Sequence, residues 1–371
     1  MAYGRPAWAE INLSAVKNNI RQIKGLLKPN TKFCAIVKAD AYSHGAAVIA
    51  KTAEEMGADY IGVAIFDEAV TLRDAGITLP ILILGPTPDI FSKHIVANNF
   101  TATIFTKEQA DNLSAAAVVM GTDAKVHIKI DTGMSRIGVT PDEAADFYAY
   151  VKGLPRMNVE GTFTHFATAD SADKTGANKQ FAEFTRALKA MEAKAGPIPI
   201  KHSANSAAIV DMPETHLDMV RAGIILYGLW PSDETTQPIP LEPVMKLKAR
   251  VSAVKTVGTD VGVGYGFTAQ APAGTVIATL PLGYADGYTR LLSNKATVLV
   301  RGKRAPIIGN ICMDQCMINV SRISDIQEGD EVLLFGGSDL PVEELAALLG
   351  TINYEMVTTV GKRVPRLYIA P

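Results

Sequence analysis

Eight short apolar segments between residues 33 and 221 are mostly separated by segments of helical character, and this alternation restricts the fold more than any other feature. Strands that alternate with helices of ten or more residues pair in parallel. Eight such units predict a closed (β/α)8 barrel of the TIM type, in the α/β class. A doubly wound open sheet is the alternative, but no glycine-rich dinucleotide-binding motif follows the first strand. The expected strands are 33–37, 60–66, 81–84, 101–105, 125–130, 157–165, 198–203 and 217–221.

The chain on either side of this region has a different pattern. Residues 8–13 alternate apolar and polar side chains as a half-buried strand does, and Ser14 can cap a helix that runs to about residue 27. Residues 231–243 are rich in proline, threonine and acidic residues, which is typical of a linker. Beyond the linker only 342–349 has helical character. The expected strands there are 244–257, 275–280, 296–300, 318–320 and 331–335.

These patterns predict two domains. We expect the barrel over residues 1–235 and a mainly β domain over residues 236–371. The N-terminal strand at about 8–13 can pair with the second domain, since it precedes the first helix of the barrel pattern.

Composition argues against several classes of protein. Of the 371 residues, 48% are hydrophobic and 20% charged, which is enough apolar material for a large core. The net charge of -2 leaves no basic stripe for nucleic acid, and no apolar run is long enough to span a membrane. The N-terminus lacks a signal pattern, and the three cysteines are sparse and odd in number. We therefore expect a cytoplasmic protein with reduced thiols, without nucleic-acid or membrane partners.

A metal site is not expected. Cys312 and Cys316 have a spacing loosely like that of metal ligands, but no histidine or second cysteine pair accompanies them.

The segment 33–45, FCAIVKADAYSHG, places a lysine where chemistry is possible. Lys38 stands at the end of a strand buried on both faces, and removal from water lowers the pKa of a lysine. A neutral amine is what Schiff-base chemistry requires. The ordinary alternative is that Lys38 ends the strand and pairs with a carboxylate such as Asp40.

Other polar residues follow the same strand ends. Enzymes built on parallel barrels carry their chemistry at the C-terminal ends of the strands. Arg136 follows the fifth strand, His165 ends the sixth and Arg221 ends the eighth. Residues that suit an anion-binding turn follow the seventh and eighth strands: Asn205, Ser206, Gly223 and Ile224. A reactive lysine beside a phosphate cradle points to pyridoxal 5'-phosphate (PLP) as the cofactor.

The segment 33–45 resembles the cofactor-lysine segment of the bacterial alanine racemases, PLP enzymes that join a (β/α)8 barrel to a C-terminal β domain. Other similar stretches run through nearly the whole chain in order: HIKIDTGMSRIG, THFATAD, HSANSAA, RAGIILYG, VGYG, GYADGY, GNICMDQ and RVPR. Two positions depart from the family pattern. Ser43 stands where the family usually has glycine, and Asn310 stands where a basic residue is common. Neither departure removes a catalytic group.

The resemblance implies interconversion of L-alanine and D-alanine by two bases. Lys38 would bind PLP covalently and then act as the base on one face of the substrate Cα. Tyr265 of the partner subunit would act on the opposite face, since racemisation removes a proton from one face and delivers it to the other. The family is an obligate homodimer with active sites shared across the interface, and it supplies D-alanine for peptidoglycan of the cell wall.

The resemblance also implies roles for the other residues. Arg221 would face the pyridine nitrogen and suppress transamination, with His165 beside the ring. Arg136 would meet the cofactor phenolate and the substrate carboxylate. Lys129, seven residues earlier and directed inward, is often carbamylated in the family. The residues that bind the cofactor phosphate would be Tyr42, Ser206, Gly223, Ile224 and Tyr354. Met313 and Tyr284 of the partner subunit would narrow the pocket, which suits a methyl side chain.

Three other functions remain open at this point. A racemase of broader specificity, for serine or basic amino acids, would use the same scaffold. A decarboxylase of this architecture typically has an acidic residue at the pyridine nitrogen, so Arg221 and Tyr265 argue against it. Non-catalytic PLP carriers on the same barrel usually lack the β domain.

Overall fold

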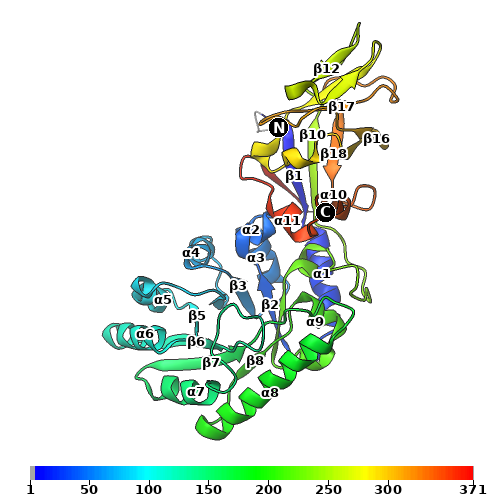
Figure 1. Ribbon diagram of the computed structural model, residues 1–371. Helices are drawn as coiled ribbons and strands as arrows, with labels where there is room; N and C mark the ends of the chain where they lie inside the picture. The colour runs from blue at the N-terminus through cyan, green and yellow to red at the C-terminus, as the bar shows by residue number, and fades with distance from the viewer. Residues whose placement is uncertain (1–4, 371) are drawn as a thin grey trace. The chain divides into compact units, whose positions relative to one another are not determined.

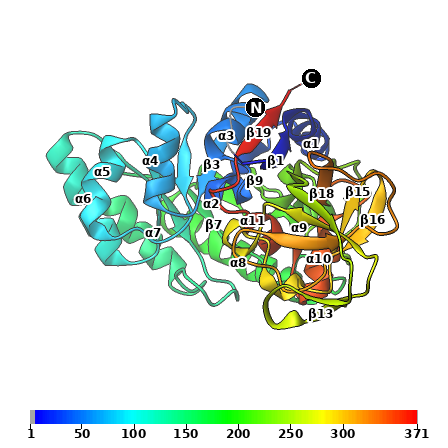
Figure 2. The same cartoon turned by 90° about the horizontal axis from the view of Figure 1, so that it is seen from above.

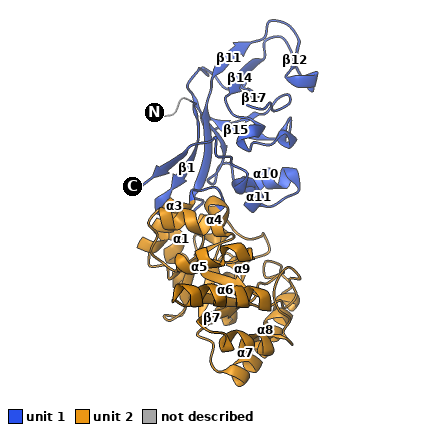
Figure 3. Ribbon diagram, turned by 90° about the vertical axis from the view of Figure 1, so that its left-hand side faces the viewer, with its two compact units in different colours: residues 1–15, 42–45, 242–371 blue, residues 16–41, 46–241 orange. Residues whose placement is uncertain are grey.

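The computed structural model describes residues 5–370 of the chain. They divide into two compact units (Figure 3). Unit 1 takes the residues up to 15, residues 42–45 and the residues from 242 onward, and unit 2 takes 16–41 and 46–241. Within the described residues, no helix is both long and apolar enough to cross a membrane.

Unit 2 is a barrel of eight parallel strands, as the alternating pattern predicts. The strands follow the order β8-β7-β6-β5-β4-β3-β2-β9, and every hydrogen-bonded pair is parallel. The backbone N–H groups of Asp218 and Arg221 donate to the carbonyls of Lys201 and Ala204, both at 3.0 Å, and so join the strands β8 and β9 at the two ends of this order. The strands are β2 (Lys32–Ile36), β3 (Tyr60–Val63), β4 (Ile81–Ile83), β5 (Thr101–Ile104), β6 (Ala124–Lys129), β7 (Met157–Phe163), β8 (Ile200–His202) and β9 (Met219–Ala222).

Helices lie outside the barrel strands (Figures 1 and 2). Their ends follow capping rules: Thr106 and Gln109 form a capping box at the start of α6, and Gly121 ends α6 in the left-handed conformation. The helices are α1 (Leu13–Gly25), α3 (Ala46–Glu55), α4 (Phe66–Asp74), the 3-10 turn η1 (Asp89–Phe91), α5 (Ser92–Ala97), α6 (Lys107–Met120), α7 (Ala144–Gly153), α8 (Thr175–Ala195) and α9 (Ser206–Asp211).

One expected helix start is wrong. Asn12, rather than Ser14, caps α1, because its Oδ1 accepts hydrogen bonds from the backbone N–H groups of Ser14 (3.0 Å) and Ala15 (3.2 Å).

Unit 1 is built from β-sheets. A six-stranded sheet has the order β16-β15-β18-β10-β1-β19, and smaller sheets join β11-β14-β17 and β12-β13. The N-terminal strand β1 pairs antiparallel with β10 and parallel with the C-terminal β19. Figure 2 shows β1 and β19. The strands are β1 (Ala7–Asn12), β10 (Met245–Arg250), β11 (Ala253–Thr256), β12 (Val261–Val263), β13 (Ala269–Ala271), β14 (Val276–Leu280), β15 (Thr297–Val300), β16 (Lys303–Pro306), β17 (Cys316–Asn319), β18 (Glu331–Phe335) and β19 (Arg366–Ile369).

Two expectations for unit 1 need correction. The single strand expected over 244–257 is two strands in different sheets: Val251 N donates to Asp330 O beside β18, whereas Ser252 N donates to Thr279 O in β14. The backbone therefore changes partner between these two residues. The segment 342–349 is helical as expected (α10, Val342–Leu349), but a second helix follows it, α11 (Asn353–Thr358).

The chain leaves β2 through a left-handed turn rather than an ordinary loop. Residues 39–43 all have positive φ, from 51° at Tyr42 to 65° at Ser43, and none of them is glycine. Each such residue costs about 1–2 kcal/mol, so neighbouring groups must hold the turn, which is labelled α2 (Lys38–Tyr42). Glu68 accepts a hydrogen bond from Ala39 N at 2.5 Å, and Asp40 accepts one from Ala46 N at 2.8 Å. Strain of this kind is concentrated at functional sites.

Ser43 gives a test of this strain. Its Oγ donates to Thr358 O at 2.8 Å, and its φ of 65° favours glycine. Ser43→Ala loses the hydrogen bond and keeps the strain, so we expect a destabilisation of about 1–2 kcal/mol. Ser43→Gly loses the same bond but relieves the strain, so its unfolding midpoint in urea should lie above that of Ser43→Ala. Equal unfolding midpoints for Ser43→Ala and Ser43→Gly would contradict the presence of backbone strain at residue 43.

Candidate active site

The expected site residues of unit 2 follow the C-terminal ends of the barrel strands. Lys38 lies two residues after β2, His165 two residues after β7, and Arg221 inside β9. Arg136 lies in the loop after β6. Burial is the main cause of the lowered pKa values of Lys38 and His165, and the nearby charge of Arg136 lowers both further. The structure therefore brings these four side chains together at one end of the barrel.

Arg221 is the most tightly held member of this group. Arg221 is only 3% exposed to solvent. The Nη1 atom donates to His202 Nδ1 (2.9 Å), and Nη2 donates to the carbonyls of Thr164 (2.9 Å) and Ser203 (3.0 Å) and to His165 Nδ1 (3.1 Å). Burial lowers its pKa to about 10, so the guanidinium remains charged at neutral pH.

The contacts of Arg221 fix the tautomers of two histidines. An arginine has no acceptor, so His165 and His202 must each accept at Nδ1 and carry their proton on Nε2. The Nε2–H of His202 then donates to His127 Nδ1 at 2.9 Å. Burial, followed by the charge of Arg221, holds the pKa of all three imidazoles below the usual range, to about 3 for His127. All three rings are therefore neutral at physiological pH.

Sequence reasoning missed His202 and His127. The alternation of inward and outward side chains along each strand carried the signal for both residues. His127 lies two residues before Lys129, which was expected to point inward, and His202 lies two residues after the buried Ile200 in β8.

Lys38 has the amine that covalent chemistry needs. Burial and the nearby charge of Arg136 lower its pKa, with Glu68 acting in the opposite direction. Within residues 5–370, its Nζ donates no hydrogen bond and forms no ion pair, so the alternative pairing with Asp40 does not occur; Asp40 instead accepts from the backbone of Ala46.

Lys129 is a second buried amine. Its Nζ donates to the carbonyl of Ile130 at 2.9 Å and lies 5.4 Å from the ring centroid of Phe163. Burial and the charge of Arg221 lower its pKa to about 7, so a large share of the amine is neutral at physiological pH.

The cluster carries an excess of positive charge. Arg136 forms no hydrogen bond or ion pair with any described residue, and its side chain is exposed. Among residues 5–370, the carboxylates that favour the charged forms of the two lysines are Glu68, for Lys38, and Asp131, for Lys129. Such a site suits an anionic ligand, and a phosphorylated cofactor together with an amino-acid carboxylate meets that requirement.

The turns after β8 and β9 meet at Ser206. The hydroxyl of Ser206 accepts a hydrogen bond from Gly223 N at 2.9 Å, which leaves its own proton able to donate to a ligand. Asn205 caps α9, since its Oδ1 accepts from Ala208 N at 3.1 Å. Ile224 begins the 3-10 turn η3 (Ile224–Tyr227) and is fully buried. Its expected contribution is therefore its backbone N–H.

The remaining expected residues belong to unit 1. Tyr42 and Tyr354 lie together, with ring centroids 6.2 Å apart, and burial raises the pKa of Tyr42. Tyr265 begins the 3-10 turn η4 (Tyr265–Phe267) between β12 and β13, and Tyr284 begins another, η5 (Tyr284–Asp286). Tyr265 is 71% exposed, Met313 52% and Tyr284 41%.

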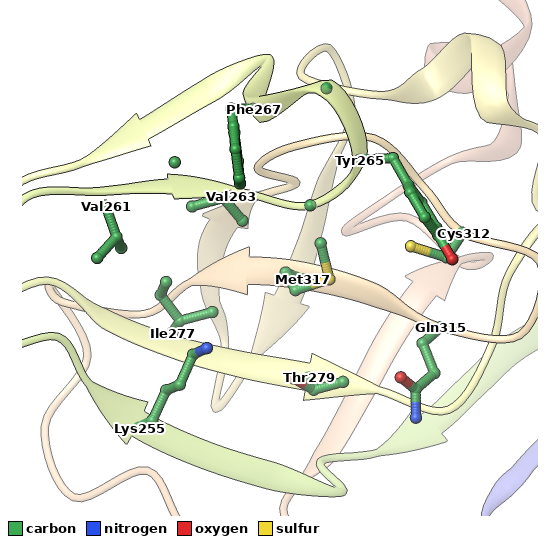
Figure 4. Close-up of a pocket in the computed structure, with 13 residues that line it drawn as sticks. Lys255, Val261, Val263, Tyr265, Phe267, Ile277, Thr279, Cys312, Gln315 and Met317 are labelled. Atoms are coloured by element: carbon green, nitrogen blue, oxygen red, sulfur yellow. The ribbon is translucent and has the colours of Figure 1, made fainter.

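A pocket of about 510 Å³ opens beside Tyr265 (Figure 4). Tyr265 and Phe267 line it from the turn, and Thr279, Gln315 and Met317 line it from the neighbouring sheet. An exposed surface of this kind, rich in aromatic and methionine side chains, is typical of a protein interface.

Comparison with known proteins gives the same family along the whole chain. Residues 11–231 match the family described as alanine racemase, N-terminal domain, and residues 244–368 match alanine racemase, C-terminal domain. A curated alanine racemase of Desulfovibrio desulfuricans is 60% identical over 369 residues, covering 100% of both chains. One from Desulforamulus reducens is 50% identical and covers 98% of this chain and 99% of its own.

Solved structures of alanine racemases are also similar along nearly the whole chain. An alanine racemase of Clostridium difficile 630 superposes with a TM-score of 0.96 at 43% identity, covering 99% of this chain and 96% of its own. An alanine racemase from Bacillus anthracis with bound L-Ala-P has a TM-score of 0.94 at 38% identity, covering 100% of this chain and 96% of its own.

Proposed function

This chain belongs to the alanine racemase family of isomerases, and from that premise we propose that it interconverts L-alanine and D-alanine with PLP bound at Lys38. The observation that carries the proposal is the half-buried amine of Lys38, which has no partner among residues 5–370 and lies within a cluster of cations. Its lowered pKa favours the neutral amine that covalent attachment needs, and the surrounding charges favour an anionic cofactor.

The residues present fit PLP. Lys38 would hold it covalently, and Ser206, Gly223 and Ile224, with Tyr42 and Tyr354, would hold its phosphate. Arg221 would face the pyridine nitrogen, with His165 beside the ring. When bound, PLP withdraws electrons from the substrate Cα and makes its proton more acidic.

Two bases then complete the reaction. Arg136, whose guanidinium has no partner among the described residues, would bind the substrate carboxylate and orient Cα. The Nζ of Lys38 moves the proton on one face of Cα. The Oη of Tyr265 of the partner subunit moves it on the other face. Arg221 is a cation held by four acceptors, so it cannot stabilise a protonated pyridine nitrogen as a carboxylate would, which supports its role in suppressing transamination.

Exposed side chains of unit 1 support a homodimer with shared sites. Tyr265, Tyr284 and Met313 are all substantially exposed, as is Phe267 at 68%. We propose that these residues close the partner's site, where Tyr284 and Met313 limit the pocket to a methyl side chain. The expected physiological role is supply of D-alanine for peptidoglycan, in the cytoplasm.

Purified PLP-loaded protein tests the proposed substrate. It should convert L-alanine to D-alanine, which chiral chromatography would measure. Its kcat/KM for alanine should be well above that for serine, lysine or arginine. Faster racemisation of serine or a basic amino acid would favour the broader racemase. PLP binding without racemisation of any amino acid would favour a carrier.

We predict that the side-chain amine of Lys129 reacts with carbon dioxide. The neutral amine reacts with CO2 to give a carbamate and a proton, and the lowered pKa of about 7 makes the neutral form abundant at physiological pH. The carbamate would be an anion beside Arg136. Carbon-13 NMR with labelled bicarbonate should show one carbamate signal that grows as pH rises through about 7 and is absent from Lys129→Gln. A signal unchanged in that variant would contradict this assignment.

A further inference from the structure

The turn that carries Tyr265 is held only in part by its own side chains: the ring of Phe267 lies over Gly262, where a Cβ would come within 2.5 Å of that ring. Residues 264–268 join β12 and β13, whose apolar residues pack into a small core with Val257 and Ile277. Beyond that core the side chains of Tyr265 and Phe267 are mostly exposed. A two-stranded ribbon is only marginally stable by itself, so other contacts must hold its tip.

Two asparagines supply those contacts. Asn310 Nδ2 donates to the backbone carbonyl of Tyr265 at 2.6 Å. Asn294 Nδ2 donates to Thr268 Oγ1 at 3.1 Å, while its Oδ1 accepts from Gly309 N at 2.7 Å. The turn is therefore tied to residues 309–310 at both of its ends. Gly309 allows this approach, because a Cβ there would lie 2.6 Å from Val263 O.

The same segment supports the other two residues expected at the partner's site. The carbonyls of Cys312 and Met313 accept hydrogen bonds from Tyr284 N and Ala285 N, both at 3.0 Å. A Cβ on Gly283 would collide with these carbonyls, so the two backbones are in close contact. The segment 309–313 thus fixes the backbone positions of Tyr265 and Tyr284 relative to Met313.

We propose that Asn310 is a positioning residue for Tyr265. By holding the backbone carbonyl of Tyr265, Asn310 sets the location of the Tyr265 phenol. The inference rests on the proposed role of Tyr265 as a base. An amide donor at this position does two things: it binds the carbonyl directly, and it adds no charge beside the turn. The ring of Tyr265 is 71% exposed, so a hydrogen bond that fixes its backbone is a direct way for the side chain of another residue to restrain the position of the ring.

Asn310→Leu and Asn310→Asp test the proposal, since both keep the approximate size of the side chain and remove the donor. We expect kcat to fall about two- to tenfold, the effect of one hydrogen bond, with KM, PLP content and melting temperature unchanged. Asn319→Leu is the matched control: this asparagine, the last residue of β17 in the same unit, accepts from Ser321 N at 3.0 Å, and the variant should keep wild-type kcat.

Isotope effects separate positioning from general loosening. With alanine deuterated at Cα, weakening only the Tyr265 step should raise the primary isotope effect for one enantiomer and lower it for the other. An unchanged kcat, equal changes for both enantiomers, or a fall in kcat together with PLP content and melting temperature would each overturn the proposal. A wild-type protein that fails to racemise alanine would instead overturn the proposed function first, before any variant is compared.

Discussion

Lys38→Ala is expected to abolish both covalent attachment of PLP and racemisation, with a loss of at least about 1,000-fold, the range seen when a covalent catalyst is removed. The physical reason is that Lys38 has the amine with a lowered pKa and no partner among the described residues, whereas the amine of Lys129 is already bound to a carbonyl. Borohydride reduction of the PLP-loaded wild type should attach the cofactor to the peptide that contains Lys38, as mass spectrometry would show.

The loss of racemisation in Lys38→Ala should not reflect unfolding of the protein. Lys38 lies beside the like charge of Arg136, and alanine removes this repulsion. The melting temperature of the cofactor-free variant should therefore stay close to that of the cofactor-free wild type. Lys51→Ala is the matched control, because Lys51 is exposed on α3 and pairs with Glu54 on the same helix. Attachment of PLP to another lysine in the Lys38 variant, with racemisation retained, would contradict the assignment.

Tyr265→Phe is expected to lower racemisation about 100- to 10,000-fold, the usual contribution of a general acid or base. The phenol hydroxyl is the only group removed, and its ring is exposed, so PLP content and melting temperature should not change. In deuterium oxide one enantiomer should still exchange its Cα proton, because Lys38 remains, while conversion to the other enantiomer nearly stops.

Tyr150→Phe serves as the control for this change. Its hydroxyl donates to Asp111 on the outside of the barrel unit at 2.5 Å, and its loss should leave racemisation intact. If Tyr265→Phe racemises at the wild-type rate, another group must act on the second face of Cα.

The barrel and the positions of its polar residues could be predicted because they depend on local patterns. Short apolar strands separated by long helices imply parallel pairing, and the C-terminal ends of parallel strands lie at one end of a barrel. Lys38, Arg136, His165 and Arg221 were found by that rule alone, and they lie where it predicts.

The partners of these residues could not be predicted in the same way. The chain from Arg221 through His202 to His127 depends on which inward side chains of β9, β8 and β6 come within 3 Å of one another. Alternation identifies the inward positions, but it does not say which of them touch. The contact between Asn310 and the carbonyl of Tyr265 likewise joins residues 45 positions apart.

The left-handed turn after Lys38 was also beyond sequence reasoning. Its residues, ADAYS, contain no glycine, and local preference therefore opposes the observed conformation. Hydrogen bonds from distant groups hold it, including those to Glu68 and to Thr358 O. The change of sheet after Val251 is similar, because only the positions of Asp330 and Thr279 show where the backbone changes partner.

Mixing two inactive variants would test the shared active site most directly. Lys38→Ala and Tyr265→Phe are unfolded to monomers and refolded together, so that about half of the dimers contain one chain of each kind. Each mixed dimer has one site with both Lys38 and Tyr265 intact and one site with neither. We predict that alanine racemisation returns to about a quarter of the wild-type rate, since half of the dimers carry one working site of two. If the mixture remains as inactive as its separate components, the two bases do not come from different subunits.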